Sequence, residues 1–158
     1  MTLIYIGEKS GLKAGTIKGS EAVIYKNIIL FIMGSGLYYL LELFWRGYSH
    51  WTMGIVGGLS FVLIGSINEH LSWKTPLWKQ AGIGTLIILT LEFITGCIVN
   101  IWLGWQIWDY SDMPFNLLGQ ISLPFAGLWF ILSALAIILD DVLRSFLFHE
   151  RFEGYRIY

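Results

Sequence analysis

The chain has 158 residues, of which 56% are hydrophobic, 16% aromatic and only 13% charged. An ordinary soluble domain carries about 25% charged residues, so this composition excludes a disordered chain and a soluble globular domain. With 10 Lys and Arg against 11 Asp and Glu, the net charge is -1, which leaves no basic footprint for nucleic acid. The single cysteine, Cys97, cannot form an internal disulfide and lies in an apolar run.

Residues 1–24 carry three lysines and two glutamates but no apolar core followed by a small-residue cleavage site. We therefore predict a cytoplasmic N-terminal tail over 1–24 and not a secretory signal. Four apolar stretches follow, over about 25–45, 51–67, 78–103 and 117–139. A bilayer core about 30 Å thick needs about 20 helical residues, and backbone amides in lipid must be satisfied within each segment. The second stretch is the shortest of the four.

These stretches predict an all-α membrane protein, a four-span transmembrane helical bundle over 25–143 with a cytoplasmic C-terminal tail at 144–158. Lys and Arg are retained on the cytoplasmic side of membranes, so their distribution predicts orientation. Only Arg46 falls on the opposite side, which predicts an even number of spans and two cytoplasmic termini. The other basic residues lie in the tails, at the start of the first span and in the loop between spans two and three: Lys9, Lys13, Lys18, Lys26, Lys74, Lys79, Arg144, Arg151 and Arg156.

Tryptophans gather at the ends of the third stretch, with Trp73 and Trp78 at the inner end and Trp102, Trp105 and Trp108 at the outer end. Indole rings settle at headgroup depth, which makes these residues interfacial anchors. The alternative interpretation is a stacking platform for a ligand.

Glu92 lies near the middle of the third stretch, where a charged side chain costs about 2.5 to 3.5 kcal/mol on insertion scales. It should therefore face protein or water. Two interpretations stay open: a hydrogen-bonded structural acid, or a group that binds and releases a proton or cation. Glu92, Gly96 and Asn100 share one helical face, and this stripe either packs against a neighbouring element or lines a narrow path.

Glu42 precedes Arg46 by four residues, in the order that favours an ion pair along a helix. At the interface such a pair is a solvated cap. Because spans one and three run in the same direction, an alternative is that Glu42 and Arg46 converge with Glu92 in one buried network.

The outer loop offers oxygen ligands from Asp109, Asp112, Asn116 and Gln120, which could hold a hard cation or a substrate. The order of a twelve-residue calcium loop is absent. The competing interpretation is a tight turn in which Asp and Ser cap backbone amides.

Pro124 would leave the carbonyl of Gln120 without its helical partner, which predicts a kinked fourth helix or an interrupted start. An alternative makes 113–120 a re-entrant turn. In the second stretch, Gly54 and Gly58 have the spacing that lets another helix approach closely, within the chain or in a dimer.

Several motifs are absent. The sequence has no GxxxxGK[ST] phosphate-binding loop, and no GxSxG or HExxH, so we predict no catalytic residue, no cofactor and no ATPase activity of its own. Any ATP-driven role would need a separate ATPase. His50, His70 and His149 are too widely spaced for a zinc site, and we predict no metal.

The run from Ile107 to Arg144 contains WDYS at 108–111, PFN at 114–116 and GQI at 119–121. It resembles the signature region of the bacterial membrane family named "putative ABC-transporter type IV", or CmpB-like permeases. Glu92 followed by Thr95 and Gly96, and Gly36 followed by Glu42, are similar to further positions of that family. Many relatives carry a Gly-Pro-rich stretch after the first span, whereas 47–58 contains no proline.

The resemblance implies transport in the bacterial cytoplasmic membrane. We predict a permease-like subunit in contact with the lipid bilayer, with a homo-oligomer, a membrane partner subunit or a separate ATPase as partners and no nucleic acid. The alternative is a structural or holin-like assembly protein that forms homo-oligomers. An enzyme that acts on lipids through Asp109 and Asp112 is a weaker third interpretation, because no pair of nucleophile and base accompanies them.

Overall fold

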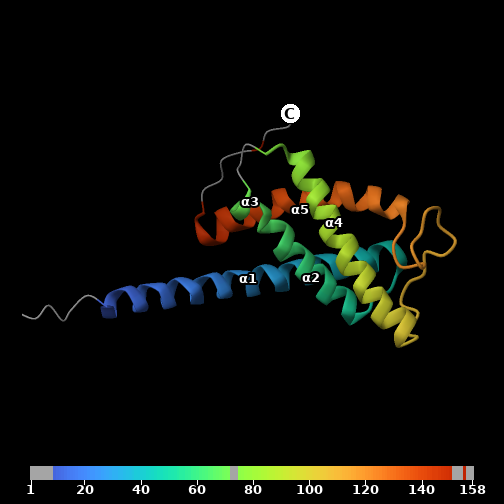
Figure 1. The fold of residues 1–158 in the computed structure, drawn as a ribbon, viewed down its shortest axis with the longest axis horizontal. Coiled ribbons are helices and arrows are strands. Elements are labelled where there is room, and N and C mark those ends of the chain that lie inside the picture. The colour runs from blue at the N-terminus through green and yellow to red at the C-terminus, as the bar shows by residue number, and fades with distance from the viewer. Residues whose placement is uncertain (1–8, 72–74, 151–154, 156–158) are drawn as a thin grey trace, which may run out of the picture.

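The structure, a computed structural model, describes residues 9–71, 75–150 and 155. Parts of the predicted tails, the anchor Trp73 and the charges of Lys74, Arg151 and Arg156 lie outside these residues. Across the described residues the chain is helical and has no strand beyond one isolated bridge. The elements are α1 (Lys9–Arg46), α2 (Trp51–Gly65), α3 (Ile67–His70), α4 (Leu77–Gly96), the π-helix η1 (Cys97–Trp102) and α5 (Leu123–Phe148), as Figure 1 shows.

Three helical segments are long and apolar enough to cross a membrane: Gly19–Arg46, Leu77–Trp102 and Leu123–Phe148. The prediction of an all-α membrane protein is confirmed at this level. The segment α2 is apolar but has only 15 residues. Since the bilayer requirement is about 20 residues, α2 alone falls short of the length expected of a span.

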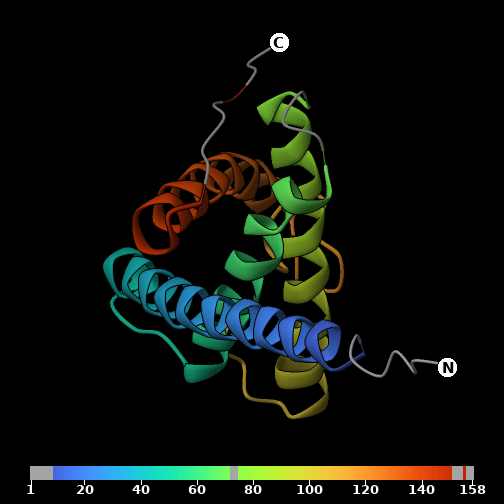
Figure 2. The ribbon, with the colours of Figure 1, turned by 90° about the vertical axis from the view of Figure 1, so that its left-hand side faces the viewer.

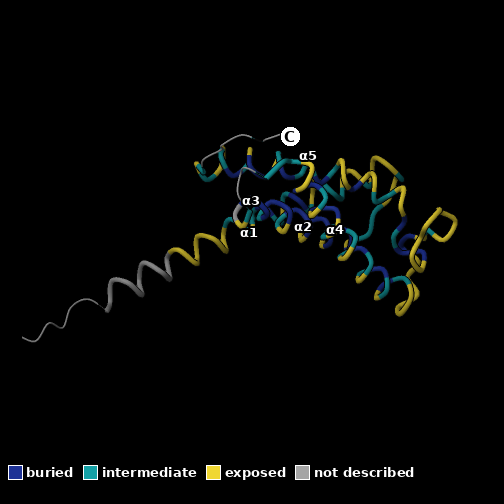
Figure 3. The backbone as a smooth tube through the Cα atoms, turned by 45° about the horizontal axis from the view of Figure 1, so that its top comes forward, coloured by how far each residue is buried: buried dark blue, intermediate teal, exposed yellow. Residues whose placement is uncertain are grey.

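The short helix α2 occupies the centre of the bundle. It packs against α1, α4 and α5, and α4 packs in turn on α5, whereas α1 and α5 do not pack along each other. Figure 2 shows α1 and α5 on separate sides of the molecule, joined through α2 and α4. Buried residues concentrate where α2, α4 and α5 meet, and the first turns of α1 after residue 18 are exposed (Figure 3).

Glycines of α2 allow α1 to approach closely. A Cβ atom at Gly58 would collide with the carbonyl oxygen of Phe31 and with the hydroxyl of Ser35, and one at Gly57 would collide with the Tyr38 side chain. The Ser35 Oγ donates a hydrogen bond of 2.6 Å to the carbonyl of Gly54. Of the two roles left open for the glycine pair, this structure shows packing within the chain.

The ends of two helices differ from the predicted spans. The helix α1 begins at Lys9, so much of the predicted tail 1–24 is helical. The helix α5 begins at Leu123 and not near residue 117, with Pro124 in its first turn. In that position the missing amide of proline has no helical partner to lose, so no kink is required and the predicted kink is not confirmed. Leu117 and Ile121 form a short bridge before the helix.

Candidate functional site

The carboxyl group of Glu92 is buried between α4, α5 and the loop that precedes α5. The side chain is 1% exposed. Its Oε2 accepts a hydrogen bond of 2.8 Å from the indole Nε1 of Trp129, and its Oε1 accepts one of 3.1 Å from the hydroxyl of Tyr110. The prediction that this acid faces protein is confirmed. Both donors are neutral groups, so they orient the carboxylate without cancelling its charge.

The predicted stripe on α4 receives the loop 103–122. A Cβ atom at Gly96 would collide with the side chains of Gln120 and Trp108, so glycine admits the loop at this point. One turn later, in η1, Asn100 donates a hydrogen bond of 2.8 Å to the Gln120 Oε1 and accepts one of 2.8 Å from the amide of Ile107. The stripe therefore packs against the loop.

Glu42 and Arg46 form the predicted ion pair at the end of α1, with 2.9 Å between Arg46 Nη2 and Glu42 Oε1. The hydroxyl of Ser49 also donates to Glu42, and Arg46 Nη1 donates 3.2 Å to the carbonyl of Ile107. The Tyr38 hydroxyl donates a longer bond of 3.4 Å to Glu42. The pair is mostly buried and ties the end of α1 to the loop.

Tyr38 is the link between this ion pair and the surroundings of Glu92. Its ring lies 5.8 Å from the ring of Trp129, centroid to centroid. The interactions of Tyr38 with Glu42 and of Trp129 with Glu92 therefore place the two acids on either side of one aromatic pair. No direct hydrogen bond joins Glu42 and Glu92 among the described contacts.

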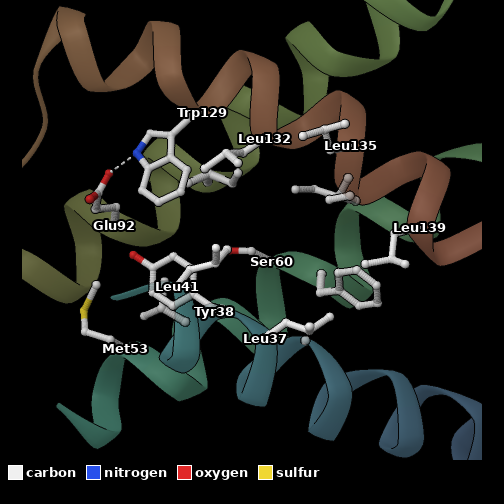
Figure 4. Close-up of a pocket in the computed structure, with 17 residues that line it drawn as sticks. Leu37, Tyr38, Leu41, Met53, Ser60, Glu92, Trp129, Leu132, Leu135 and Leu139 are labelled. Atoms are coloured by element: carbon white, nitrogen blue, oxygen red, sulfur yellow. Dashed lines mark hydrogen bonds between the residues drawn. The ribbon is translucent and has the colours of Figure 1, made fainter. Parts of the chain in front are cut away.

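A pocket of about 260 Å³ opens beside Glu92. Figure 4 shows Glu92, Trp129 and Met53 at one end of the pocket and Leu135 and Leu139 at the other. Leucines from α1 and α5 form the two walls, and residues of α2 form the floor. The polar groups in the lining are few: the Glu92 carboxyl, the Tyr38 hydroxyl and the Ser60 hydroxyl, of which the Ser60 Oγ is buried without a hydrogen-bond partner.

The polar side chains of the outer loop bind the loop's own backbone. Asp109 Oδ1 accepts hydrogen bonds from the amide and the hydroxyl of Ser111, at 2.8 and 2.6 Å, and these bonds lower the pKa of the Asp109 carboxyl. Asn116 donates to the carbonyls of Ser111 and Met113. Gly119 takes a positive φ of 68°, and a Cβ there would collide with Asp109 and Ser111. This geometry is that of a capped turn.

Of the other predicted ligands in this loop, Gln120 is buried and Asp112 is exposed. The Gln120 side chain is held by Asn100 and donates 2.9 Å to the carbonyl of Leu118. The backbone carbonyl of Gln120, which a helical proline would have left open, accepts 3.0 Å from the indole of Trp108. Within the described residues no group of three or more His, Cys, Asp or Glu side chains could hold a metal ion.

The folded loop presents Tyr110 to Glu92. The Tyr110 ring stacks on Phe125 of α5, with 4.4 Å between centroids, and its amide donates to the carbonyl of Gly119. Burial raises the pKa of the Tyr110 hydroxyl, and the neighbouring Glu92 carboxylate raises it further. Tyr110 therefore stays protonated and can donate to Glu92. Sequence reasoning placed Tyr110 in the loop motif without a role, because only the fold brings it to α4.

A second buried polar cluster lies at the opposite end of the bundle, and sequence reasoning missed it. Asp140 is 0% exposed, and its Oδ2 accepts 2.5 Å from Arg144 Nε one turn later. Asp141 accepts 2.6 Å from Asn68 Nδ2 and a further bond from the Tyr155 hydroxyl. The signal was present in the sequence, since an acid precedes a base by four residues at the end of an apolar run.

This all-helical chain combines membrane-length helices with a buried acid, which are features of a polytopic membrane protein. The family model described as "Putative ABC-transporter type IV" matches residues 8–151, and the chain therefore belongs to that family. The family predicted from the loop motifs is thus confirmed. No solved structure matches this chain.

Proposed function

We propose that this chain is a permease-like subunit of a bacterial transport system in the cytoplasmic membrane, and that it works with a separate ATPase. The observation that carries this proposal is the buried carboxyl of Glu92, which ends an apolar pocket and has only neutral hydrogen-bond donors. An ionisable group inside a membrane bundle is expensive to bury, and such groups mark substrate and ion pathways.

We propose four spans with both termini on the cytoplasmic side. The helix α2 measures about 22 Å at 1.5 Å per residue, but the course through α3 to His70 lengthens it to about 30 Å. Three helices surround α2, so it needs little contact with lipid. Lys26, near the start of the first span, pairs with Glu150, just beyond α5, at 2.5 Å. This contact supports an even number of spans, because it places both ends of the bundle together.

In this proposal Glu92 binds the proton or cation, while Tyr110 and Trp129 fix its orientation. Glu42 and Arg46 hold the end of α1 against the loop. Asn100, Asp109, Asn116 and Gln120 shape the loop that delivers Tyr110, and Asp112 lies exposed at the outer surface. The supporting observations are the bonds that these side chains make to the loop backbone.

Ion flux in proteoliposomes tests the proposal. The purified chain is reconstituted with pyranine inside the vesicles, and proton movement is followed under an imposed gradient, with sodium and potassium gradients run in parallel. We expect flux in the native chain and its loss in Glu92→Gln. The matched control is Glu21→Gln, which removes an acid from the exposed part of α1. Equal flux in the native chain and in Glu92→Gln would dismiss Glu92 as the coupling residue.

A second candidate function is that of a structural or holin-like assembly protein that forms homo-oligomers. The observation that favours it is the loop, whose polar side chains are consumed by its own backbone. This function predicts large homo-oligomers in detergent and a lower melting temperature in Glu92→Ala, with no dependence on any solute. Mass measurement by light scattering, together with melting in the presence of solutes, separates it from the transport proposal.

A further inference from the structure

We propose that the pocket between α1 and α5 binds an amphipathic cation, such as a long-chain alkylammonium, with the charged head at Glu92 and the chain between the two helices. The inference rests on the proposed function and deepens it, because it names the class of substrate that the intramembrane site would take.

The walls of the pocket suit an aliphatic chain. Leu37 and Leu41 of α1 face Leu135 and Leu139 of α5 across the pocket (Figure 4). These leucines are 38% to 57% exposed, and α1 and α5 do not pack along each other, so the pocket opens sideways between them. The helices on both sides are of membrane length. The opening therefore faces the lipid chains, from which an amphipath can enter without crossing water.

The head of the ligand is specified by the charge of Glu92. Among the described residues no lysine, arginine or histidine forms an ion pair with it. The nearest base in the network, Arg46, is held by both oxygens of Glu42 and by a loop carbonyl. A carboxylate accepts about four hydrogen bonds, and Glu92 receives two. A buried carboxylate without a cation is costly, and a cationic ligand supplies the missing charge.

Aromatic rings around Glu92 strengthen this preference. The indole of Trp129 and the phenol of Tyr110 both donate to the carboxyl, and the ring of Tyr38 lies 5.8 Å from that of Trp129. Ring faces attract alkylammonium groups, and aromatic cages are the usual protein site for quaternary ammonium ligands. A carboxylate beside three aromatic rings therefore matches an organic cation better than any neutral or anionic head.

The same residues argue against an inorganic ion as the ligand. Hard divalent cations take six or more oxygen ligands, whereas the lining offers one carboxyl and two hydroxyl groups, and the rest is hydrocarbon. An acyl chain alone is also insufficient. Lipid tails are as apolar as leucine, so moving a chain from the bilayer into the pocket provides no driving force. The head group must therefore supply the selectivity.

Binding to the chain in lipid nanodiscs tests the inference. Radiolabelled dodecyltrimethylammonium is equilibrated with loaded nanodiscs and, as the baseline, with empty nanodiscs of the same lipid. Dodecanol and dodecanoate, which have a similar chain but a neutral or anionic head, serve as competitors. We expect saturable binding above the baseline and no competition by either analogue. In Glu92→Gln we expect affinity at least tenfold weaker, and in the control Glu21→Gln no change.

Binding that does not exceed the empty nanodiscs would overturn the inference, and so would equal competition by all three amphipaths. Both outcomes come from the native chain, so they hold even if Glu92→Gln does not fold. The flux measurement stays independent of this one. Glu92-dependent flux without alkylammonium binding would sink the inference and leave the proposed function, whereas binding without Glu92-dependent flux would sink the function alone.

Discussion

The two ends of this bundle bury acids in opposite ways. At the end that carries the outer loop, Glu92 meets only neutral donors, Tyr110 and Trp129. At the other end, Asp140 is paired with Arg144, and Asp141 is held by Asn68. A buried acid with a resident base is part of the scaffold, because its charge is already balanced. A buried acid without one keeps a free valence for a proton or a ligand.

The largest expected effect tests the paired end. Asp140→Ala leaves the guanidinium of Arg144 without its bond of 2.5 Å in a buried setting. Removing one member of a buried pair costs about 3 to 5 kcal/mol. We expect a loss of that size in the free energy of unfolding, measured by titration with a denaturing detergent in mixed micelles.

A double variant sharpens this test. Asp140→Leu with Arg144→Met replaces both charges by apolar groups of similar size, which is often neutral for stability. We expect the double variant to recover most of the stability that Asp140→Ala loses. If Asp140→Ala unfolds like the native chain, the opposite end is not held by its ion pair and the contrast between the two ends fails.

The second prediction concerns the backbone that admits this pair. A Cβ atom at Gly65 would collide with the Asp140 carboxyl. Forcing a methyl group into a packed interior costs about 1 to 3 kcal/mol, so Gly65→Ala should lower the melting temperature in detergent. The control is Gly36→Ala, where nothing lies within 4 Å of the added atom. Equal melting of the two variants would contradict the packing described at Gly65.

The third prediction concerns the acid that lacks a base. Glu92→Gln retains an acceptor for Trp129 or Tyr110 and removes a buried charge, so it should change the free energy of unfolding by no more than about 1 kcal/mol. The measurement is the same detergent titration. A loss as large as that of Asp140→Ala would mean that Glu92 is a structural acid, and the two ends of the bundle would then be equivalent.

The smallest effect is the acid dependence of the outer loop. The folded loop lowers the pKa of Asp109, so its contribution to stability is complete above the unfolded value of about 3.9 and is lost as the pH falls through the lower, folded value. We expect the drop in melting temperature from pH 7 to pH 3 to be smaller in Asp109→Asn, which can still accept from Ser111. An identical drop in both proteins would exclude this contribution.

The sequence predicted the features that depend on composition and local geometry. Long apolar runs indicated the membrane-length helices, and the central position of Glu92 indicated a residue turned toward protein. The turn chemistry of Asp109 and Asn116 indicated the capped loop, since such side chains bind the backbone two or three residues away. The i, i+4 spacing indicated the ion pair of Glu42 and Arg46.

The features that the sequence did not predict depend on neighbours distant in the chain. Arg144 counted as a cytoplasmic charge, because hydropathy places a residue along the span and ignores what lies beside it. Only the glycine at position 65 makes room for Asp140, and only the folded loop brings Tyr110 to Glu92. The start of α5 was misplaced because apolar residues of the loop extended the run beyond the position that Pro124 favours.

The glycines of α2 have a consequence for the width of the pocket. One wall is α1, which approaches α2 at Gly57 and Gly58, and the other is α5, whose Asp140 approaches α2 at Gly65. Both walls are thus spaced from a single central helix whose thickness is set by missing side-chain carbons. Adding one methyl group to either side of that spacer would move one wall and resize the opening, although no residue that lines the hydrocarbon chain would have changed its polarity.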